Sequence, residues 1–596
     1  MAWALSFSTL PPADFTFCNG DEIKTIDPAI STGQPEGRII WALFEGLCRW
    51  HPETLEPIPG MAERWEVSED RLTYTFFLRR EALWSDGTPV TAHDFLYSFR
   101  RFLHPATAAE YAKELWYIEG ARKFTVRDVA AGDPVEVELH EKPDGALPFA
   151  PGKILHGTLL AVDDPTADRP IFTVETVEGP RRFQRVAKGA APDGVTACQM
   201  ITYDFRQVGI RMLDDHTVEI RLRHPVPYFL HLMGFYPFSP VNRRCVETHG
   251  YPAWTRPENL VVNGPFLLEF RRVRDRIRLV KNPTYWNRDA VGLQTIDALA
   301  VKSVTTMLNL YMTGQVDWIP AVPAEVVTDL LARDDFQPAP FLALYYYLIN
   351  TDRPPLDDPR VRRALAMTVD RREIVEQVTR SGQVPAYSVV PDEIGKYLDY
   401  TPPVFGAFDP EEARRLLAEA GYPGGRGAPR IEVLYNTHES HKAIAEVIQA
   451  QWKRHLGIDV GLSNQEWGAY LTSRRQRRYM VARAGWIGDY VDPNTFLDLF
   501  TTDNPQNQTG WSHAEYDRLV HAAQRERDER RRLELFHAAE EILLDELPLI
   551  PIYFYVSQSM VRPYVTGFYP NIQDVHPLWA IGIDEQKRER MRREGR

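Results

Sequence analysis

Four short segments between residues 411 and 462 decide the fold class: Glu411–Ala420 (EEARRLLAEA), Ile431–Tyr435 (IEVLY), His441–His455 (HKAIAEVIQAQWKRH) and Ile458–Leu462 (IDVGL). The first and third have the composition and apolar spacing of helices, whereas the second and fourth are short runs typical of strands. Helices and strands therefore alternate along this part of the chain. That alternation predicts an α/β fold.

The same two element types are predicted nearer the N-terminus. Residues 37–50 carry apolar side chains at helical spacing, and Tyr74–Leu78 is typical of a strand. Ser85–Pro89 predicts a turn, after which Thr91 is expected to cap a helix over Ala92–Phe102. From about 140 to 210 the chain is richer in Pro, Gly, Ala and Asp, which predicts an inserted, partly ordered surface elaboration.

Length and charge limit the possible functions. A chain of 596 residues is too long for a single core, so several domains or lobes are expected. The net charge is -13, and the sequence pI is about 5.7. Nucleic acid is therefore not expected as a partner, because binding to phosphates needs a basic surface.

The four cysteines and the N-terminus give few signals. Cys18, Cys48, Cys198 and Cys245 lack CxxC spacing, so a zinc or redox motif is not expected, although one or two disulfides remain open. No run approaches the length of a transmembrane helix. Met1–Leu10 lacks the positive region and cleavage site of an export signal, and a truncated or misassigned start is the favoured interpretation.

Motifs for catalysis are absent from the sequence. It contains no GxSxG elbow, no GxxxxGK[ST] phosphate loop and no HExxH helix, so no catalytic residue, cofactor or enzymatic activity is expected. His438 and His441 superficially resemble a metal motif, but they are three residues apart at the start of a helix. Residues facing solvent or a cleft are the simpler interpretation, and no metal site is expected.

The segment Arg483–Pro493 (RAGWIGDYVDP) has the chemistry to hold a zwitterion. Arg483 and Asp489 lie six positions apart, beside glycines that allow backbone to approach a ligand closely. An extended peptide would need such opposite charges for its two ends, and a strand-like site for its main chain. The alternative remains open that Asp489 caps a turn, Arg483 forms an internal ion pair and Trp486 belongs to the core.

Several segments, in a fixed order, resemble one family. They are Thr25–Pro28, Gly33–Glu36, Leu43–Leu47, Trp84–Phe95 (WSDGTPVTAHDF), Asn282–Trp286, Asp358–Leu365, Asn464–Trp467 and Arg483–Tyr490. Together they resemble the large extracytoplasmic solute-binding proteins of ABC importers, specifically the oligopeptide-binding branch. The resemblance extends from about Phe17 to Tyr569 and is interrupted at roughly 140–210.

This resemblance implies an α/β, three-lobed periplasmic-binding-protein-like fold with a hinged ligand cleft. Lobe I would be assembled from residues 1–46, 242–316 and 557–596. Lobe II would comprise residues 47–241 with the insertion at about 140–210, and lobe III would comprise residues 317–556. Lobes I and III would close around the ligand.

The resemblance also implies roles for individual residues. Asp489 would pair with the peptide α-amine, and Trp486 and Ile487 would line the site and offer backbone groups. Arg483, His441 and Arg353 would be the cationic positions that meet peptide carboxylates. The other positions would form side-chain pockets or reach in from lobe II: Trp467, Arg474, Asn436, Tyr111, Thr32 and Gln34. Thr32, Gln34 and Ile487 differ from the family's residue types, which leaves the preference of their pockets open.

The expected function is a monomeric receptor, periplasmic or at the cell surface, that captures oligopeptides and delivers them to an ABC permease in the inner membrane. A receptor for a murein peptide or a non-peptide solute is the alternative within the family. A peptidase and a holdase chaperone are the alternatives from other classes.

Overall fold

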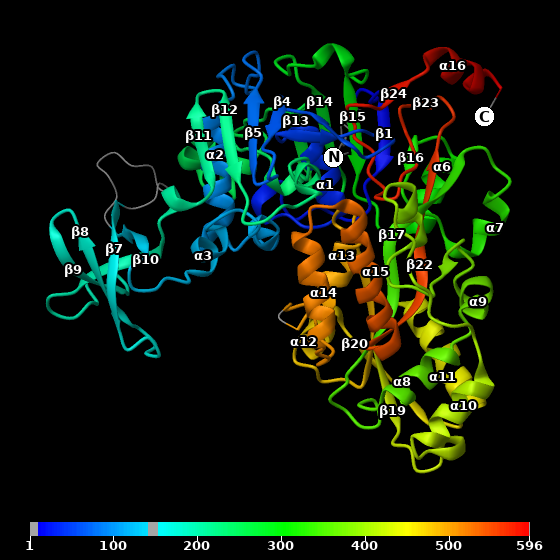
Figure 1. The fold of residues 1–596 in the computed structure, drawn as a ribbon. Helices are drawn as coiled ribbons and strands as arrows, with labels where there is room; N and C mark the ends of the chain where they lie inside the picture. Colours follow the sequence, from blue (N-terminus) through cyan, green and yellow to red (C-terminus); the bar gives the residue numbers. More distant parts are fainter. Residues whose placement is uncertain (1–9, 141–152, 503, 595–596) are drawn as a thin grey trace, which may run out of the picture. The chain divides into compact units, whose positions relative to one another are not determined.

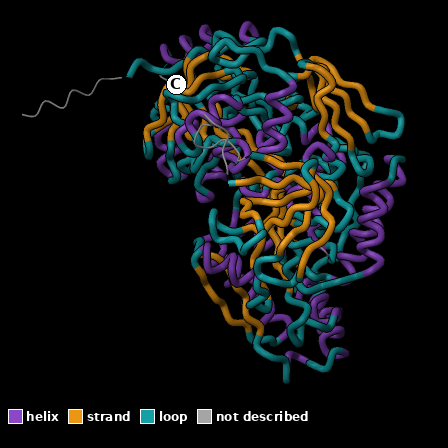
Figure 2. The backbone as a smooth tube through the Cα atoms, turned by 90° about the vertical axis from the view of Figure 1, so that its left-hand side faces the viewer, coloured by secondary structure: helices purple, strands orange, loops and turns teal. Residues whose placement is uncertain are grey.

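The computed structural model describes residues 10–140, 153–502 and 504–594, which divide into two compact units. The first unit contains the described residues within 1–319, 562–569 and 575–596, and the second contains 320–561 and 570–574. Figures 1 and 2 show helices and strands in both units. The predicted α/β class is therefore confirmed, while the division into three lobes stays a prediction.

The first unit is built on a sheet with the strand order β13 (Phe266–Arg272), β14 (Arg276–Lys281), β15 (Thr295–Leu299), β1 (Phe15–Cys18) and β16 (Trp318–Ile319). β1 pairs with β15 in parallel, whereas β14 pairs antiparallel with β13 and β15. Phe17 of β1 stacks on Trp318 of β16 with ring centroids 5.0 Å apart, and both side chains are fully buried. The core of this unit therefore lies on a face of the sheet.

A second, antiparallel sheet has the order β11 (Ile210–Asp214), β12 (Thr217–Arg221), β5 (Thr73–Leu78) and β4 (Ala62–Val67). Helix α2 (Ala92–Leu103) packs against it and begins with a capping box between Thr91 and Asp94. The strand and the capped helix predicted here are confirmed.

The helix predicted over residues 37–50 is only half right. Helix α1 (Gln34–Leu43) ends early, and the chain continues as strand β2 (Cys48–Trp50). The N–H of Cys48 donates to the carbonyl of Met233, and a Cβ on Gly46 would lie 2.7 Å from that carbonyl oxygen. Close packing against a remote carbonyl therefore replaces the next helical turn.

The segment predicted as a partly ordered elaboration instead forms a closed barrel in its described residues. Its strands are β6 (Pro134–Leu139), β7 (Ile154–Asp163), β8 (Ile171–Thr176), β9 (Gly179–Arg185) and β10 (Thr196–Tyr203). Alternating side chains of these strands form a separate core that includes Val135, Val137, Val174 and Phe183. The Pro, Gly and Asp residues that suggested disorder lie largely between the strands. Residues 141–152 lie outside the described residues.

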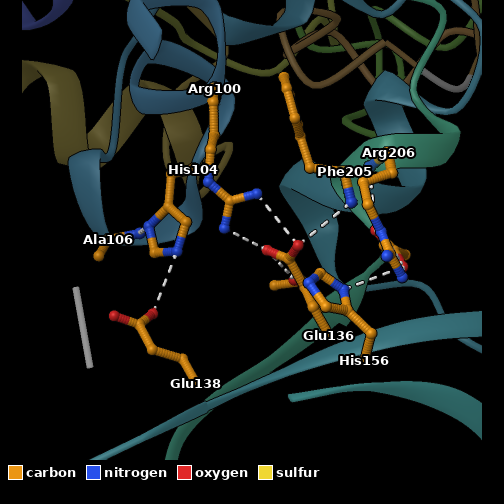
Figure 3. A network of polar contacts seen from close by, with 10 residues as sticks. Arg100, His104, Ala106, Glu136, Glu138, His156, Phe205 and Arg206 are labelled. Atoms are coloured by element: carbon orange, nitrogen blue, oxygen red, sulfur yellow. Dashed lines mark hydrogen bonds and ion pairs between the residues drawn. The ribbon is translucent and has the colours of Figure 1, made fainter. Parts of the chain in front are cut away.

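A network of ion pairs joins this barrel to helix α2 (Figure 3). Arg100 of α2 forms two hydrogen bonds to the carboxylate of Glu136 on β6, one of them 3.0 Å long, and the Glu136 side chain is only 5% exposed. The backbone N–H of Phe205 donates to the same carboxylate. His104, which directly follows α2, lies 3.5 Å from Glu138. Charged hydrogen bonds therefore attach the barrel firmly to the unit.

The second unit is built on a sheet with the order β22 (Leu549–Val561), β17 (Phe336–Ile349), β21 (Val481–Ile487), β19 (Ile431–Asn436) and β20 (Val460–Gln465). β19 pairs in parallel with β20 and β21, whereas β17 is antiparallel to β21 and β22. Helix α11 (Glu439–Leu456) connects β19 to β20 and packs on both strands. The helix–strand alternation predicted over residues 411–462 is confirmed.

The remaining helices and strands complete the two units. In the first unit they are β3 (Pro57–Pro59), α3 (Ala121–Val126), α4 (Phe229–Leu232), α5 (Arg243–His249), α6 (Val304–Met312), β23 (Val565–Thr566), β24 (Gly582–Ile583) and α16 (Glu585–Arg593). In the second they are α7 (Val327–Leu330), α8 (Pro359–Met367), α9 (Arg371–Glu373), β18 (Val384–Pro385), α10 (Pro410–Glu419), α12 (Trp467–Arg475), α13 (Asn494–Leu497), α14 (Ala514–Arg525) and α15 (Glu529–Glu546). Among the described residues, no helix has the length and apolar character needed to cross a membrane. All four cysteines are buried as free thiols.

A fully buried carboxylate, Glu540 on α15, holds a loop of the second unit. It accepts hydrogen bonds from the N–H groups of Val389 and Val390, at 2.7 and 2.9 Å, and from the hydroxyl of Tyr400 at 2.6 Å. Burial raises the pKa of Glu540 to about 7, although these donors act in the opposite direction. The carboxyl therefore titrates near neutral pH.

This raised pKa predicts pH-dependent stability. The protonated carboxyl stabilises the folded state fully below pH 4.5, and this contribution is lost as the pH rises through about 7. The difference between the ordinary pKa of 4.5 and the raised pKa of about 7 corresponds to a stabilising free energy of at most about 3 kcal/mol. We expect the free energy of unfolding of the wild-type protein to fall, relative to that of Glu540→Gln, between pH 4.5 and 7 in denaturant titrations. Parallel pH profiles for the two proteins would contradict this.

The contacts between Arg100 and Glu136, here called the barrel joint, predict that Arg100 contributes far more to the stability of the protein than an exposed arginine does. Arg100→Met leaves the buried Glu136 carboxylate without its cation, so we expect a loss of roughly 3 kcal/mol and faster hydrogen exchange in β6. Arg64 is the matched control, because it also pairs with a glutamate, Glu66, but the two side chains are 53% and 65% exposed. Arg64→Met should cost less than about 1 kcal/mol. Equal losses in the two variants would rule out the joint as a stabilising element.

Candidate functional site

The candidate site lies where strand β21 leaves its parallel neighbour. β21 pairs with β19 only at Val481 and Ala482, whereas its pairing with β17 continues to Ile487. Beyond Ala482, the other edge of β21 has no strand partner among the described residues. In open α/β sheets, ligands bind in the crevice outside the carboxyl ends of the parallel strands.

The backbone groups on this open edge can be identified. The carbonyl of Arg483 accepts a hydrogen bond from Tyr470 of α12, whereas the N–H of Gly488 donates to Leu342 on the β17 side. Because the backbone groups of successive residues point to alternate edges, those of Gly485 and Ile487 point the same way as the Arg483 carbonyl. An extended main chain could therefore pair with β21 here.

Arg483 is mostly buried among tyrosines. Its guanidinium lies 4.8 Å from the ring centroid of Tyr345, and it donates to Tyr555 at 3.1 Å and to Asn436 at 3.4 Å. Its Nε is buried and has no hydrogen-bond partner in the described part of the chain. Within the same residues it forms no ion pair, so a buried cation here lacks a carboxylate partner.

His441 belongs to the same cluster but is uncharged. Its Nδ1 lies 3.4 Å from the hydroxyl of Tyr345, and its ring lies 4.8 Å from that of His438. Burial, followed by the positive charge of Arg483, lowers the pKa of His441 to about 3. The imidazole is neutral at pH 7, so it can form hydrogen bonds but does not act as the expected cation.

Helix α12 contributes two more of the expected residues. Trp467, which is 53% exposed, stacks on Tyr470 with ring centroids 5.6 Å apart. Arg474 donates to Gln508 at 3.0 Å and lies close to the hydroxyl of Tyr470. Tyr470 therefore connects these two side chains to the carbonyl of Arg483.

The end of β21 and the turn after it hold Trp486, Ile487 and Asp489. The hydroxyl of Thr495 accepts from the backbone N–H of Asp489 at 3.2 Å and lies 3.5 Å from the indole nitrogen of Trp486. Gln573 donates to the carbonyl of Asp489. A Cβ on residue 488 would lie 2.7 Å from Leu342, so the turn needs Gly488. Ile487 is 51% exposed and forms the open surface beside these residues.

Of the remaining expected residues, Arg353 lies in the second unit but outside this cluster, and the others belong to the first unit. Arg353 lies on an exposed turn after β17, where its N–H donates to the carbonyl of Asn350. Tyr111, Thr32 and Gln34 are partly buried residues of the first unit, and the Tyr111 ring packs edge-on against Phe235. Their roles stay predictions.

Sequence reasoning missed the tyrosines that surround Arg483. Tyr345, Tyr553 and Tyr555 come from β17 and β22, and Tyr345 stacks on Tyr553 at 4.6 Å. The spacing of Tyr553 and Tyr555 places both on one face of a strand. That pattern marks a shared aromatic face, but it does not show that an arginine from another strand packs there.

One cluster of possible metal ligands exists among the described residues. Ligand atoms of Glu136, His156 and Asp204 lie within 4.8 Å of one another at the barrel joint. Both carboxylates, however, already accept charged hydrogen bonds, Glu136 from Arg100 and Asp204 from Arg206. A cation would have to displace both guanidinium groups, so the chemistry of this cluster fits an ion-pair network rather than a metal site.

Comparisons with known proteins agree with this fold. Residues 56–508 match the model of the bacterial extracellular solute-binding proteins, family 5 Middle. The chain is 34% identical over 556 residues to the periplasmic oligopeptide-binding protein OppA of Salmonella typhimurium, covering 92% of this chain and 88% of the relative. It is 33% identical over 564 residues to the periplasmic murein peptide-binding protein MppA of Escherichia coli, covering 93% and 90%.

A solved structure is also similar over nearly the whole chain. It is a periplasmic oligopeptide-binding protein from Borrelia burgdorferi, with a TM-score of 0.73, 30% identity and coverage of 96% of this chain and 99% of the other. Family match, sequence identity and fold therefore agree, and the chain belongs to family 5 of the bacterial extracellular solute-binding proteins.

Proposed function

We propose that this protein captures oligopeptides and delivers them to an ABC transporter permease. The observation that carries the proposal is the open edge of β21, with the unmatched cation Arg483 at its start and Asp489 just beyond its end. An extended peptide can pair with such an edge through its main chain, whatever its side chains are. Relatives of the chain that are named oligopeptide-binding proteins support the same ligand class.

The two charges set the direction and length of the peptide. The α-amine would lie at Asp489 and the carboxylate at Arg483, so the peptide would run antiparallel to β21. Arg483 and Ile487 are separated by about 13 Å of strand, given a rise of about 3.3 Å per residue. Peptides of three to five residues therefore fit between the charges. Neutral His441 would add hydrogen bonding near Arg483, while Trp467 and Ile487 would contact side chains.

The protein would act in the periplasm or at the cell surface, and the relatives that are named periplasmic proteins support this location. It would act there as a monomer. It would bind without catalysis, because main-chain pairing and end charges hold a peptide but supply no nucleophile or activated water. Release to the permease would then depend on opening of the site.

A murein peptide is the second candidate ligand, favoured by the 33% identity to the murein peptide-binding protein. Such a ligand would still offer an amine and carboxylates to Asp489 and Arg483. Competition between a murein tripeptide and an ordinary tripeptide of matched charge would separate the two candidates. Preferred binding of the murein tripeptide would assign that narrower role.

Acetylation of the peptide tests the role of Asp489. After removal of bound ligand by unfolding and refolding, tri- to pentapeptides are titrated by calorimetry, each beside its N-acetylated form. We expect acetylation to weaken binding roughly 30- to 100-fold, because it removes a charge-assisted hydrogen bond. In Asp489→Asn the two forms should bind alike. Equal binding of both forms by the wild-type protein would remove Asp489 from this role.

Removal of Arg483 should weaken binding while making the protein more stable. In the wild-type protein, C-terminal amidation of a tripeptide should weaken binding, and in Arg483→Met amidation should have no effect. The same variant removes a buried cation that lacks a carboxylate, so we expect its free energy of unfolding to rise by about 1 kcal/mol. Arg474→Met, which breaks a bond to Gln508, is the control and should not gain stability. If amidation still weakened binding by Arg483→Met, the proposed binding role would be contradicted.

A further inference from the structure

The second unit contains a groove that lies outside the candidate site. It has a volume of about 820 Å³ and is lined by the π-helix Ile374–Thr379, the following turn, strand β18 and Thr328 of α7. A π-helix of this length is rare, and such segments are frequent at functional sites. The groove shares no lining residue with the cluster around Arg483.

Two arginines on the rim of the groove lack acidic partners. Arg372 and Arg380 are exposed, and neither forms an ion pair within the described residues. The Nε of Arg380 donates to the carbonyl of Gln377 at 3.0 Å, which fixes the side chain at the end of the π-helix. Glu376 is the one carboxylate among the lining residues, so the rim has a net positive charge.

A third arginine lies behind the wall of the groove. Arg371 is fully buried, and its Nε and Nη1 donate to the carbonyls of Pro551, Ala366 and Val369. Its Nη2 has no hydrogen-bond partner among the described residues. The guanidinium lies 5.0 Å from the ring centroid of Tyr387, which lines the groove. Burial lowers the pKa of Arg371 to about 10, so the group is still charged at pH 7.

The shape of the groove favours a chain segment over a small anion. Its volume far exceeds that of a phosphate or a single carboxylate, and it includes apolar surface from the half-exposed Val384 and from Pro385. The protein as a whole has a net charge of -13. The acidic surface as a whole repels an acidic segment, so the locally positive rim determines where and in which orientation such a segment binds.

We propose that this groove is a docking site for an acidic segment of another polypeptide. Carboxylates of the segment would pair with Arg372 and Arg380, and its apolar atoms would contact Val384, Pro385 and Tyr387. The docking site does not depend on the candidate peptide site at β21, because it consists of different residues and binds a segment without free peptide termini.

A peptide without a free α-amine and α-carboxylate separates this site from the candidate peptide site at β21. A hexapeptide of six glutamates, labelled with fluorescein at the N-terminus and amidated at the C-terminus, is titrated with the intact protein at low ionic strength. Fluorescence anisotropy reports binding. The same labelled peptide with six glutamines is the control, because it carries the charge of the label but no side-chain carboxylates. We expect binding of the glutamate peptide alone, and weaker binding as salt is added.

Two variants of opposite sign test the assignment. The double variant Arg372→Met, Arg380→Met should weaken binding about fivefold to tenfold, since two exposed ion pairs are lost. Glu376→Gln should strengthen binding, because it removes the carboxylate that repels the ligand. The double variant Arg475→Met, Arg478→Met is the matched control, since it removes two exposed arginines of the same unit that form no ion pair in the described residues.

The outcomes decide between specific docking and general electrostatics. Equal weakening in the two double variants, or equal binding of the glutamate and glutamine peptides, would overturn the proposal. Weaker binding by Glu376→Gln would overturn it as well. Absence of binding by the glutamate peptide would overturn this proposal alone, because the labelled peptide has no free amine for Asp489. The proposed function is tested separately by the acetylation experiment.

Discussion

The arrangement of the second unit depends on the point at which β21 loses its parallel partner. Up to Ala482 the strand is paired on both edges, and beyond it the strand is held by β17 alone. Helix α12 occupies the space beyond β19 and places Tyr470 against the Arg483 carbonyl. The same strand is therefore rigid at one end and available at the other, which is what a site that binds main chain requires.

Buried charges follow two different rules in this protein. Two buried carboxylates are matched by arginines, Asp297 by Arg278 and Asp492 by Arg532, and both side chains of each pair are at most 5% exposed. Arg483 and Arg371 lack such a match and are surrounded by aromatic rings and carbonyl or hydroxyl oxygens. An unmatched buried cation costs free energy, so the persistence of Arg483 is understandable where a ligand supplies the missing negative charge.

The sequence predicted the elements whose signals are local. The helices and strands between residues 411 and 462 and the capped helix α2 depend on periodicity and on a capping residue, which neighbouring side chains encode. The early end of α1 depends on the remote carbonyl of Met233 and therefore had no local signal. The barrel was missed because the connections between its strands are rich in turn-forming residues, and these obscured the alternation of apolar side chains within the strands.

The candidate site, too, was predicted only where its residues carry a local signal. Arg483, Asn436 and His441 were expected at a site, and the structure brings them together around Tyr345. The neutral state of His441 depends on burial and on the field of Arg483, neither of which can be seen in the sequence. The tyrosines of β17 and β22 were missed because their proximity to β21 is a property of strand order.

The path of the chain through the barrel has a further consequence. The chain enters at Pro134 and leaves at Asp204, and these two points are joined, because the N–H of Asp204 donates to the carbonyl of Pro134 and Val135 pairs with Tyr203. Cα atoms paired in this way lie only about 5 Å apart. A module with adjacent ends can be gained or lost in evolution without stretching its host, and its excision would leave a gap that a short turn can close. The barrel is thus a natural place for this architecture to diversify while the rest of the unit stays unchanged.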